Sequence, residues 1–273
     1  MQKIKIMTDS ASDVSPDYSK EYNIKVIGFH IIVGDKEYRE FADMTTHEFY
    51  ELLENSEELP HTSQITLEDY FEAYNEAYLQ GYTDLINVTI SSTGSNSYNN
   101  AIMAIDKFFE ENPSANDKIT ITVMDSKGYT GVYGFPVIEA AKKIQKGDSL
   151  DTVVSFLQDW FDSGIILCTA YTLKYAKKSG RVNCVAAFVG EVLGLKPIIM
   201  FVDAVSETID KIRGNKNVLP RMTEIALEKM VPQTPYAILV GSNKETADEL
   251  AEMLTKRLGY KPAHYIQVGA TIA

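Results

Sequence analysis

Four short segments of the chain are rich in serine and threonine, and their side chains could hold a ligand. These segments are residues 8–13 (TDSASD), 61–66 (HTSQIT), 91–97 (SSTGSNS) and 125–131 (DSKGYTG). A hydroxyl group donates and accepts hydrogen bonds without carrying charge, so it can serve a carboxyl group in either protonation state. The four segments therefore predict a binding site for an acidic group.

Serines and threonines in loops also cap helices and close turns, so each hydroxyl has a structural alternative. Thr66 precedes Asp69 with a spacing close to that of a capping box, which predicts a structural role for Thr66. Ser97 is expected to cap a helix that begins at Tyr98. The hydroxyl residues without such a duty are the better ligand candidates: Thr62, Ser63 and Ser95.

The common signatures of catalysis are missing from the sequence. It contains no G-x-x-x-x-G-K-[ST], H-E-x-x-H, G-x-S-x-G or G-x-G-x-x-G motif. Its four histidines have no metal-ligand spacing, so we predict neither a metal site nor a cofactor. No histidine lies in or beside residues 91–97 to activate Ser95, which favours binding over nucleophilic attack. A serine-dependent acyl transferase or hydrolase acting through Ser95 is the alternative.

The elements that must position these segments follow a regular order. Short apolar runs alternate with amphipathic helices, which is typical of a parallel sheet covered by helices. The predicted strands span residues 3–9, 86–90, 118–125, 164–170 and 235–241. Ligands bind such sheets outside the carboxyl ends of the strands, so we expect the hydroxyl-rich segments to gather at that edge.

A different pattern over residues 197–213 indicates a second domain. Two strand-like runs flank Asp203 and Ala204, which predicts an antiparallel hairpin in a mixed sheet. The expected fold class is α/β with two domains. Residues 1–161 would form a parallel α/β/α domain that carries the hydroxyl-rich loops, and residues 162–273 a second α/β domain.

Composition and charge restrict the partners. The chain has 273 residues, of which 45% are hydrophobic, and a formal net charge of −12. Such an acidic chain offers no extended basic surface, so we expect no nucleic-acid partner. The only two cysteines, Cys168 and Cys184, lie in apolar segments and are predicted to be buried thiols without a disulfide framework.

The N-terminus and the apolar runs predict the location of the protein. MQKIKIMTDS has no signal-peptide core, and no apolar run reaches the roughly 20 residues of a membrane span. We therefore expect a cytoplasmic protein. A third hypothesis, a periplasmic-type receptor for a polar solute, is disfavoured for the same reason.

Two basic clusters stand out in this acidic chain, at residues 174–181 and 210–216. Lysines near a helix end complement the helix dipole, and the second cluster could be a solvated turn. Either cluster could also receive a phosphate group or an acidic partner.

Seven short motifs, taken in chain order, resemble the DegV family of bacterial fatty-acid-binding proteins, which supply an acyl chain to a separate fatty acid kinase. The motifs are TDS at 8–10 with Asp13, TSQ at 62–64, ISSTGSNSYNNA at 90–101, DSKGYTGVYG at 125–134, LKYAKKSGRV at 173–182, LGLKPI at 193–198 and IRG at 212–214. Together they cover essentially the whole chain.

The resemblance implies a non-enzymatic carrier of two α/β domains, with a long-chain fatty acid in a buried tunnel between them. Its carboxyl group would be held by Thr62 and Ser95 and presented to a fatty acid kinase, which forms the acyl phosphate. The other candidates are Ser63, Ser92 and Ser97 for the head group, and Arg181 and Arg213 for phosphate or kinase docking. The apolar stretches 135–141 and 184–195 could line the tunnel.

The chain also departs from the family pattern. Gly94 stands where a leucine is common and Asn96 where a glycine is common, and both changes are expected to alter backbone freedom around Ser95. Family members continue past a segment like YIQVGATIA into a Gly-Pro-Gly loop, whereas this chain ends at Ala273. Either the sequence is truncated or that loop is missing, so one wall of the head-group site is left open by the sequence.

Overall fold

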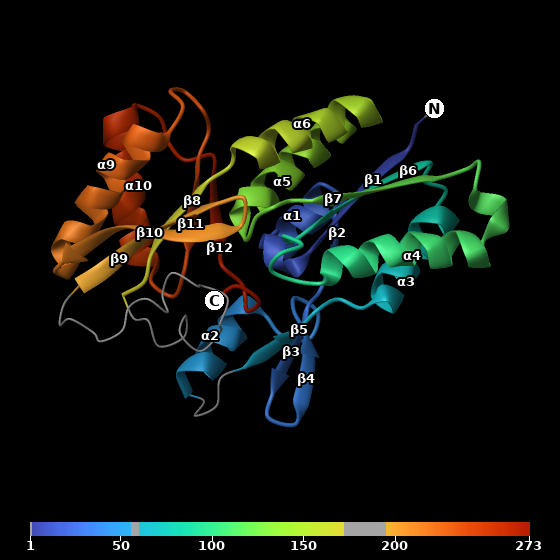
Figure 1. Ribbon diagram of the computed structural model, residues 1–273, viewed down its shortest axis with the longest axis horizontal. Coiled ribbons are helices and arrows are strands. Elements are labelled where there is room, and N and C mark those ends of the chain that lie inside the picture. The colour runs from blue at the N-terminus through green and yellow to red at the C-terminus, as the bar shows by residue number, and fades with distance from the viewer. Residues whose placement is uncertain (1, 56–59, 172–194) are drawn as a thin grey trace. The chain divides into compact units, whose positions relative to one another are not determined.

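The computed structural model describes residues 2–55, 60–171 and 195–273 (Figure 1). Its contacts divide the chain into two compact units. Unit 1 comprises Met1–Gly164 together with Val268–Ala273, and unit 2 comprises Ile165–Gln267. Residues 268–273, which the sequence placed with the second domain, thus pack with unit 1.

Unit 1 is built on a parallel sheet with the strand order β2-β1-β6-β7. Its strands are β1 (Ile4–Asp9), β2 (Lys25–Ile27), β6 (Asp84–Thr89) and β7 (Thr120–Asp125). Every residue of the central strand β6 is buried, as expected for a parallel sheet covered on both faces. The predicted parallel α/β fold is confirmed.

Helices on the two faces of this sheet bury apolar stripes against it. Helices α3 and α4 pack together on one face, and α5 and α6 on the other (Figure 1). The helices of unit 1 are α1 (Pro16–Glu21), α2 (Thr46–Asn55), α3 (Leu67–Leu79), α4 (Ser97–Glu111), α5 (Gly131–Gln145) and α6 (Leu150–Ser163). Ser15 caps α1, where Pro16 is the first helical residue.

A small antiparallel sheet, with the order β4-β3-β5, completes unit 1. Its strands are β3 (His30–Val33), β4 (Lys36–Arg39) and β5 (His61–Ser63). The expectation that residues 61–66 form a loop after a strand of the parallel sheet is wrong, because residues 61–63 are themselves an edge strand. Thr62 pairs with Ile31, a partner far away in the sequence that a local pattern does not show.

Unit 2 contains an antiparallel sheet of order β10-β9-β8 and a parallel pair, β11 with β12. Its elements are β8 (Ile166–Thr169), β9 (Leu195–Val202), β10 (Val205–Arg213), α9 (Val218–Lys229), β11 (Ala237–Val240), α10 (Lys244–Leu258) and β12 (His264–Gln267). The predicted hairpin is confirmed. Asp203 and Ala204 both have positive φ, 47° and 60°, as a tight turn between two twisted strands requires.

Two further predictions bear on unit 2 and on the helices. Cys168 on β8 is half-buried and forms no disulfide, whereas the sequence predicted a buried thiol; Cys184 lies outside the described residues. Within the described ranges, no helix is both long and apolar enough to cross a membrane.

Candidate ligand-binding site

Three of the hydroxyl-rich segments meet at the carboxyl ends of β1, β6 and β7. The Thr130 N–H donates to the Ala11 carbonyl over 2.9 Å, and the Ser91 N–H donates to the Gly128 carbonyl over 3.1 Å. The Ser92 hydroxyl donates to the Asp125 carboxylate over 2.5 Å. Because the three strands are parallel neighbours, their following loops lie at one edge and bond to one another.

The fourth segment, which carries Thr62, is fastened to this edge through Ile65. The Ile65 N–H donates to the Ser97 hydroxyl over 3.3 Å, and the Asn100 side-chain amide donates to the Ile65 carbonyl over 2.7 Å. The structure therefore brings the segment of Thr62 beside the segment of Ser95, although β5 belongs to a different sheet.

Thr62 and Ser63 lie on β5 with exposed side chains. Within the part of the chain that the structure describes, neither hydroxyl makes a hydrogen bond. Thr66, four residues beyond Thr62, is committed instead. Its hydroxyl accepts from the Asp69 N–H, and the Asp69 carboxylate accepts from the Thr66 N–H, which confirms the capping box.

Ser95 is half-buried, and its hydroxyl oxygen lies 2.9 Å from the hydroxyl oxygen of the fully buried Ser97. The Ser97 N–H also points to the Ser95 hydroxyl oxygen, over 3.3 Å. When Ser97 is the hydroxyl donor of the pair, Ser95 accepts from it and keeps its own proton for a ligand oxygen. Ser92 and Ser97 already bond to protein groups, so Ser95 has the most capacity left of the three.

Helix α4 begins at Ser97 rather than Tyr98, and Asn96 occupies the N-cap without a capping hydrogen bond from its side chain. The prediction that Ser97 is the N-cap is therefore wrong, because its hydroxyl faces Ile65 and Ser95 instead. Asn96 has φ −75°, and Gly94 is not among the glycines with positive φ. Neither residue therefore adopts the left-handed backbone conformation that glycine and asparagine tolerate.

Three buried carboxyl groups, which we call the carboxyl cluster, lie behind these loops: Asp9, Asp13 and Glu40. Asp9 ends β1, and its carboxylate accepts from the Tyr133 hydroxyl (2.5 Å), the Ile90 N–H (2.7 Å) and the Ala11 N–H (3.1 Å). Ile90 directly precedes the serine-rich loop. Asp9 therefore ties the start of that loop to β1 and α5.

Asp13 and Glu40 hold the returning C-terminal residues of unit 1. The Asp13 carboxylate accepts from the Thr130 hydroxyl over 2.5 Å and from the Gly269 N–H over 2.8 Å. The Glu40 carboxylate accepts from the hydroxyls of Ser10 (2.6 Å) and Thr271 (2.5 Å). A Cβ at position 269 would lie 2.5 Å from a Glu40 oxygen, so the close approach requires glycine.

Burial disfavours the ionised form of the three groups in the carboxyl cluster. Burial raises the pKa of Asp9 to about 7, against the hydrogen bonds that it accepts. Burial also raises the pKa of Asp13 well above its ordinary value and raises the pKa of Glu40. The TDS motif drew attention to Asp9 and Asp13, but nothing in the sequence pointed to Glu40.

The two arginine candidates belong to a different part of the chain from Thr62 and Ser95. Arg213 is exposed at the end of β10 in unit 2, and Arg181 lies outside the described residues. Residues 135–141 lie within α5, and all of them except Glu139 are buried. Residues 184–194 also lie outside the described ranges.

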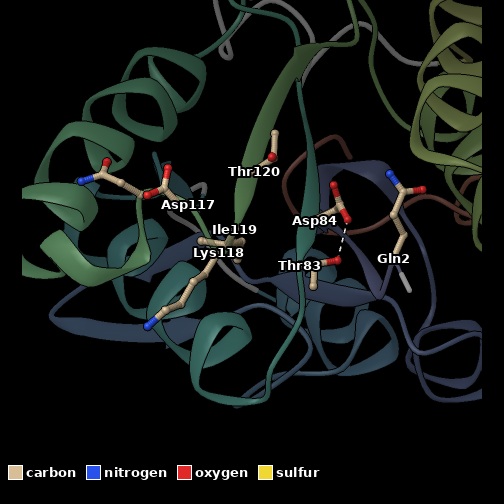
Figure 2. A pocket seen from close by; sticks show the side chains of 8 residues that line it. Gln2, Thr83, Asp84, Asp117, Lys118, Ile119 and Thr120 are labelled. Atoms are coloured by element: carbon tan, nitrogen blue, oxygen red, sulfur yellow. Dashed lines mark hydrogen bonds between the residues drawn. The ribbon is translucent and has the colours of Figure 1, made fainter.

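A cavity of about 430 Å³ opens at the opposite edge of the parallel sheet, where β6 and β7 begin (Figure 2). It is lined by polar groups that include Thr83, Asp84 and Lys118. Ligands of parallel sheets bind at the carboxyl ends of the strands, so this cavity is not the site predicted from the hydroxyl-rich segments.

Comparison with known proteins finds one family that matches nearly the whole chain. Residues 3–273 match the family model described as "Uncharacterised protein, DegV family". A DegV domain-containing protein of Clostridium perfringens is 31% identical, over 100% of this chain and 94% of its own length. Another, of Clostridium acetobutylicum, is 34% identical, over 83% of this chain and 77% of its own length.

Solved structures agree with this fold. A stearic acid-binding protein from Eubacterium ventriosum has a TM-score of 0.87 at 24% identity, covering 98% of this chain and 92% of its own. DegV, a fatty acid binding protein from Bacillus subtilis, has a TM-score of 0.81 at 24% identity, covering 100% and 94%. Because the family model matches residues 3–273 of this sequence, the chain belongs to the DegV family.

Proposed function

We propose that this chain binds a long-chain fatty acid, holds its carboxyl group with the hydroxyls of Thr62 and Ser95, and presents that group to a fatty acid kinase. The chain is then a carrier rather than an enzyme. The observation that carries this proposal is the pair of hydroxyls with spare hydrogen-bonding capacity, on two segments joined through Ile65.

Relatives with the same fold support a fatty acid as the ligand. The Eubacterium ventriosum protein binds stearic acid, and a DegV family protein from Eubacterium eligens, 21% identical with a TM-score of 0.80, was crystallised loaded with heptadecanoic acid. These ligands share a carboxyl head and a long saturated chain. Burying an acyl chain of about 16 carbons, at ~0.8 kcal/mol per CH₂, contributes on the order of 10 kcal/mol before ordering costs.

The surroundings of Ser95 favour holding an acid over attacking it. Among the described residues, no histidine or carboxylate lies within hydrogen-bonding distance of the Ser95 hydroxyl, whose partners are the hydroxyl and N–H of Ser97. A serine nucleophile needs a base to take its proton. Without one, the hydroxyl can donate to a carboxylate oxygen but gains no nucleophilicity.

The test is the lipid content of the purified protein. We expect mass spectrometry of organic extracts to find a long-chain fatty acid in the wild-type protein, and far less in the Thr62→Ala/Ser95→Ala double variant. Each lost hydrogen bond to a charged head group should weaken binding by about tenfold. Ser155→Ala, which removes an exposed hydroxyl on α6, is the matched control and should keep its ligand.

Two results would contradict the proposal. One is wild-type protein that carries no fatty acid and binds none that is added; the other is equal lipid content in the double variant and the wild type. Covalent labelling of Ser95 by a fluorophosphonate probe would favour the acyl transferase or hydrolase instead.

Presentation to a kinase has its own test. Arg213 is exposed and distant in sequence from the hydroxyl pair, so it is the candidate for contact with phosphate or with the kinase. We expect Arg213→Ala to leave the fatty acid content unchanged and to lower acyl phosphate formation by a fatty acid kinase. Equal rates for the variant and the wild type would remove Arg213 from this role.

A further inference from the structure

Tyr129, in the loop that joins β7 to α5, stands where a side chain at position 94 would begin. A Cβ built on Gly94 would lie 2.6 Å from Cε1 of Tyr129, 2.7 Å from its hydroxyl oxygen and 3.1 Å from Cζ. Real Cβ atoms do not approach other heavy atoms so closely. Gly94 has no positive φ, so the Tyr129 ring, and not the backbone conformation, is what demands a glycine there.

The turn that carries Ser95 is held on its other side by the same loop. The Ser91 carbonyl accepts from the N–H groups of Gly94 (3.0 Å) and Ser95 (3.1 Å), which closes the turn. The Ser91 N–H donates in turn to the carbonyl of Gly128, the residue before Tyr129. Two contacts therefore fix the turn: a backbone hydrogen bond at its start and the Tyr129 ring against Gly94.

The loop around Tyr129 is itself fixed in an unusual conformation. Lys127 and Thr130 both have positive φ, 50° and 51°, a region that residues other than glycine rarely adopt. Such backbone persists only where its surroundings enforce it. Here the Asp125 carboxylate accepts from the Lys127 N–H over 2.9 Å, and the Thr130 hydroxyl donates to buried Asp13. The position of Tyr129 is thus set by the fold.

We propose that Tyr129 is a positioning residue for Ser95: its ring braces the turn at Gly94 and so holds the Ser95 hydroxyl in place for the ligand. This role rests on the proposed fatty acid binding and specifies one of its supports. Tyr129 acts through the turn and not as a head-group contact. The ring, rather than the phenol hydroxyl, is then the part that matters.

The first experiment is a double-mutant cycle between Tyr129 and Ser95, read out as the dissociation constant of a fluorescent fatty acid. Tyr129→Ala should weaken binding by about tenfold in the wild-type background, because the Ser95 hydrogen bond is lost. In the Ser95→Ala background it should cost nothing further, since that bond is already absent. Tyr129→Phe should bind within about twofold of the wild type.

Gly94→Ala tests the same contact from the other side. The new methyl group must push the ring away, so binding should fall about as far as in Tyr129→Ala. Adding Gly94→Ala to Tyr129→Ala should then have little effect. Gly241→Ala is the matched control, because a Cβ at that glycine meets nothing within 4 Å and its φ is not positive.

Two results would overturn the positioning role. One is an equal loss from Tyr129→Ala with and without the Ser95 hydroxyl, and the other is a loss in Tyr129→Phe as large as in Ser95→Ala. Hydrogen exchange of the amides of residues 91–97 separates this inference from the proposed function. Tyr129→Ala should speed exchange there even in protein without ligand, and unchanged exchange would refute the brace whether or not fatty acid binds.

Discussion

Unit 1 contains two polar regions that differ in how completely the protein satisfies them. The carboxyl cluster of Asp9, Asp13 and Glu40 is at most 4% exposed, and its carboxylates accept hydrogen bonds from backbone and hydroxyl donors around them. Thr62 is exposed and its hydroxyl is unbonded within the described residues, and Ser95 has a hydroxyl proton to donate when Ser97 is the donor between the two serines. A buried polar group must find its hydrogen-bond partners within the protein, whereas an accessible hydroxyl can bond to water or to a ligand.

This comparison separates residues that hold the fold from residues that hold a ligand. The carboxyl cluster fastens the ends of β1, the serine-rich loop and residues 269–271 to one another. Its side chains are buried and bonded to donors of the protein itself. Among the residues that the structure describes, no group of three or more His, Cys, Asp or Glu residues, the carboxyl cluster included, is arranged so that it could hold a metal ion.

The largest expected effect comes from breaking the carboxyl cluster. Glu40→Ala leaves the hydroxyls of Ser10 and Thr271 and the Thr271 N–H without their acceptor. A donor left without a partner costs about 1 to 3 kcal/mol, near the lower figure for the two donors of half-buried Thr271, so we expect the free energy of unfolding to fall by about 4 to 5 kcal/mol. Urea denaturation followed by circular dichroism measures this loss.

Glu110→Ala is the control for that measurement, because Glu110 is exposed on α4 and the same atoms are removed. It should change the free energy of unfolding by no more than about 0.5 kcal/mol. If Glu40→Ala were as mild as Glu110→Ala, the carboxyl cluster would not be committed to the fold, and the contrast with the hydroxyl pair would fail.

The next effect is a pH dependence of stability. The pKa of Asp9 rises from 3.8 to about 7 in the folded protein, so between these values the folded protein binds more protons than the unfolded chain. Stability must therefore fall as the pH rises through this window, by up to about 4 kcal/mol from Asp9 alone. Asp13 and Glu40, whose pKa values are also raised, act in the same direction.

Asp69 has the opposite effect on the pH dependence of stability, and it limits the pH range in which the effect of Asp9 can be measured. The hydrogen bonds from Arg39 and Thr66 outweigh burial and hold the pKa of Asp69 at about 2, so its contribution is lost as the pH falls through about 4 toward 2. We expect denaturant unfolding to show greater stability at pH 5 than at pH 7. Asp9→Asn, which cannot ionise, should flatten that slope. An equal slope in both proteins would show that Asp9 does not carry the proton.

The sequence predicted the elements better than the site. Strands β1, β6 and β7, the cap at Ser15 and the turn at Asp203 follow from local patterns of apolar, capping and turn residues. The pairing of Thr62 with Ile31 could not be predicted in this way, because it depends on a strand about 30 residues earlier in the chain.

The same limit explains the residues that were missed. Glu40 and Gly269 come from opposite ends of the chain and meet only in the folded protein, where a Cβ at 269 would collide with the Glu40 carboxylate. Tyr129 and Gly94 likewise meet through tertiary structure. The motifs showed which segments matter, but the division between structural and available side chains depends on burial and partners that no local pattern encodes.

The smallest expected effect compares two threonines of one segment, of which one holds the fold and the other is available to a ligand. Thr66 caps α3 through its hydroxyl, so Thr66→Ala should lower the free energy of unfolding by about 1 kcal/mol and leave the fatty acid dissociation constant unchanged. Thr62→Ala should do the reverse, with stability within about 0.5 kcal/mol of the wild type and binding weaker by about tenfold. The same two measurements on both variants decide the matter. If both threonines altered stability alone, the exposed hydroxyl of Thr62 would be a surface feature of β5, and Ser95 would be left to hold the carboxyl group without it.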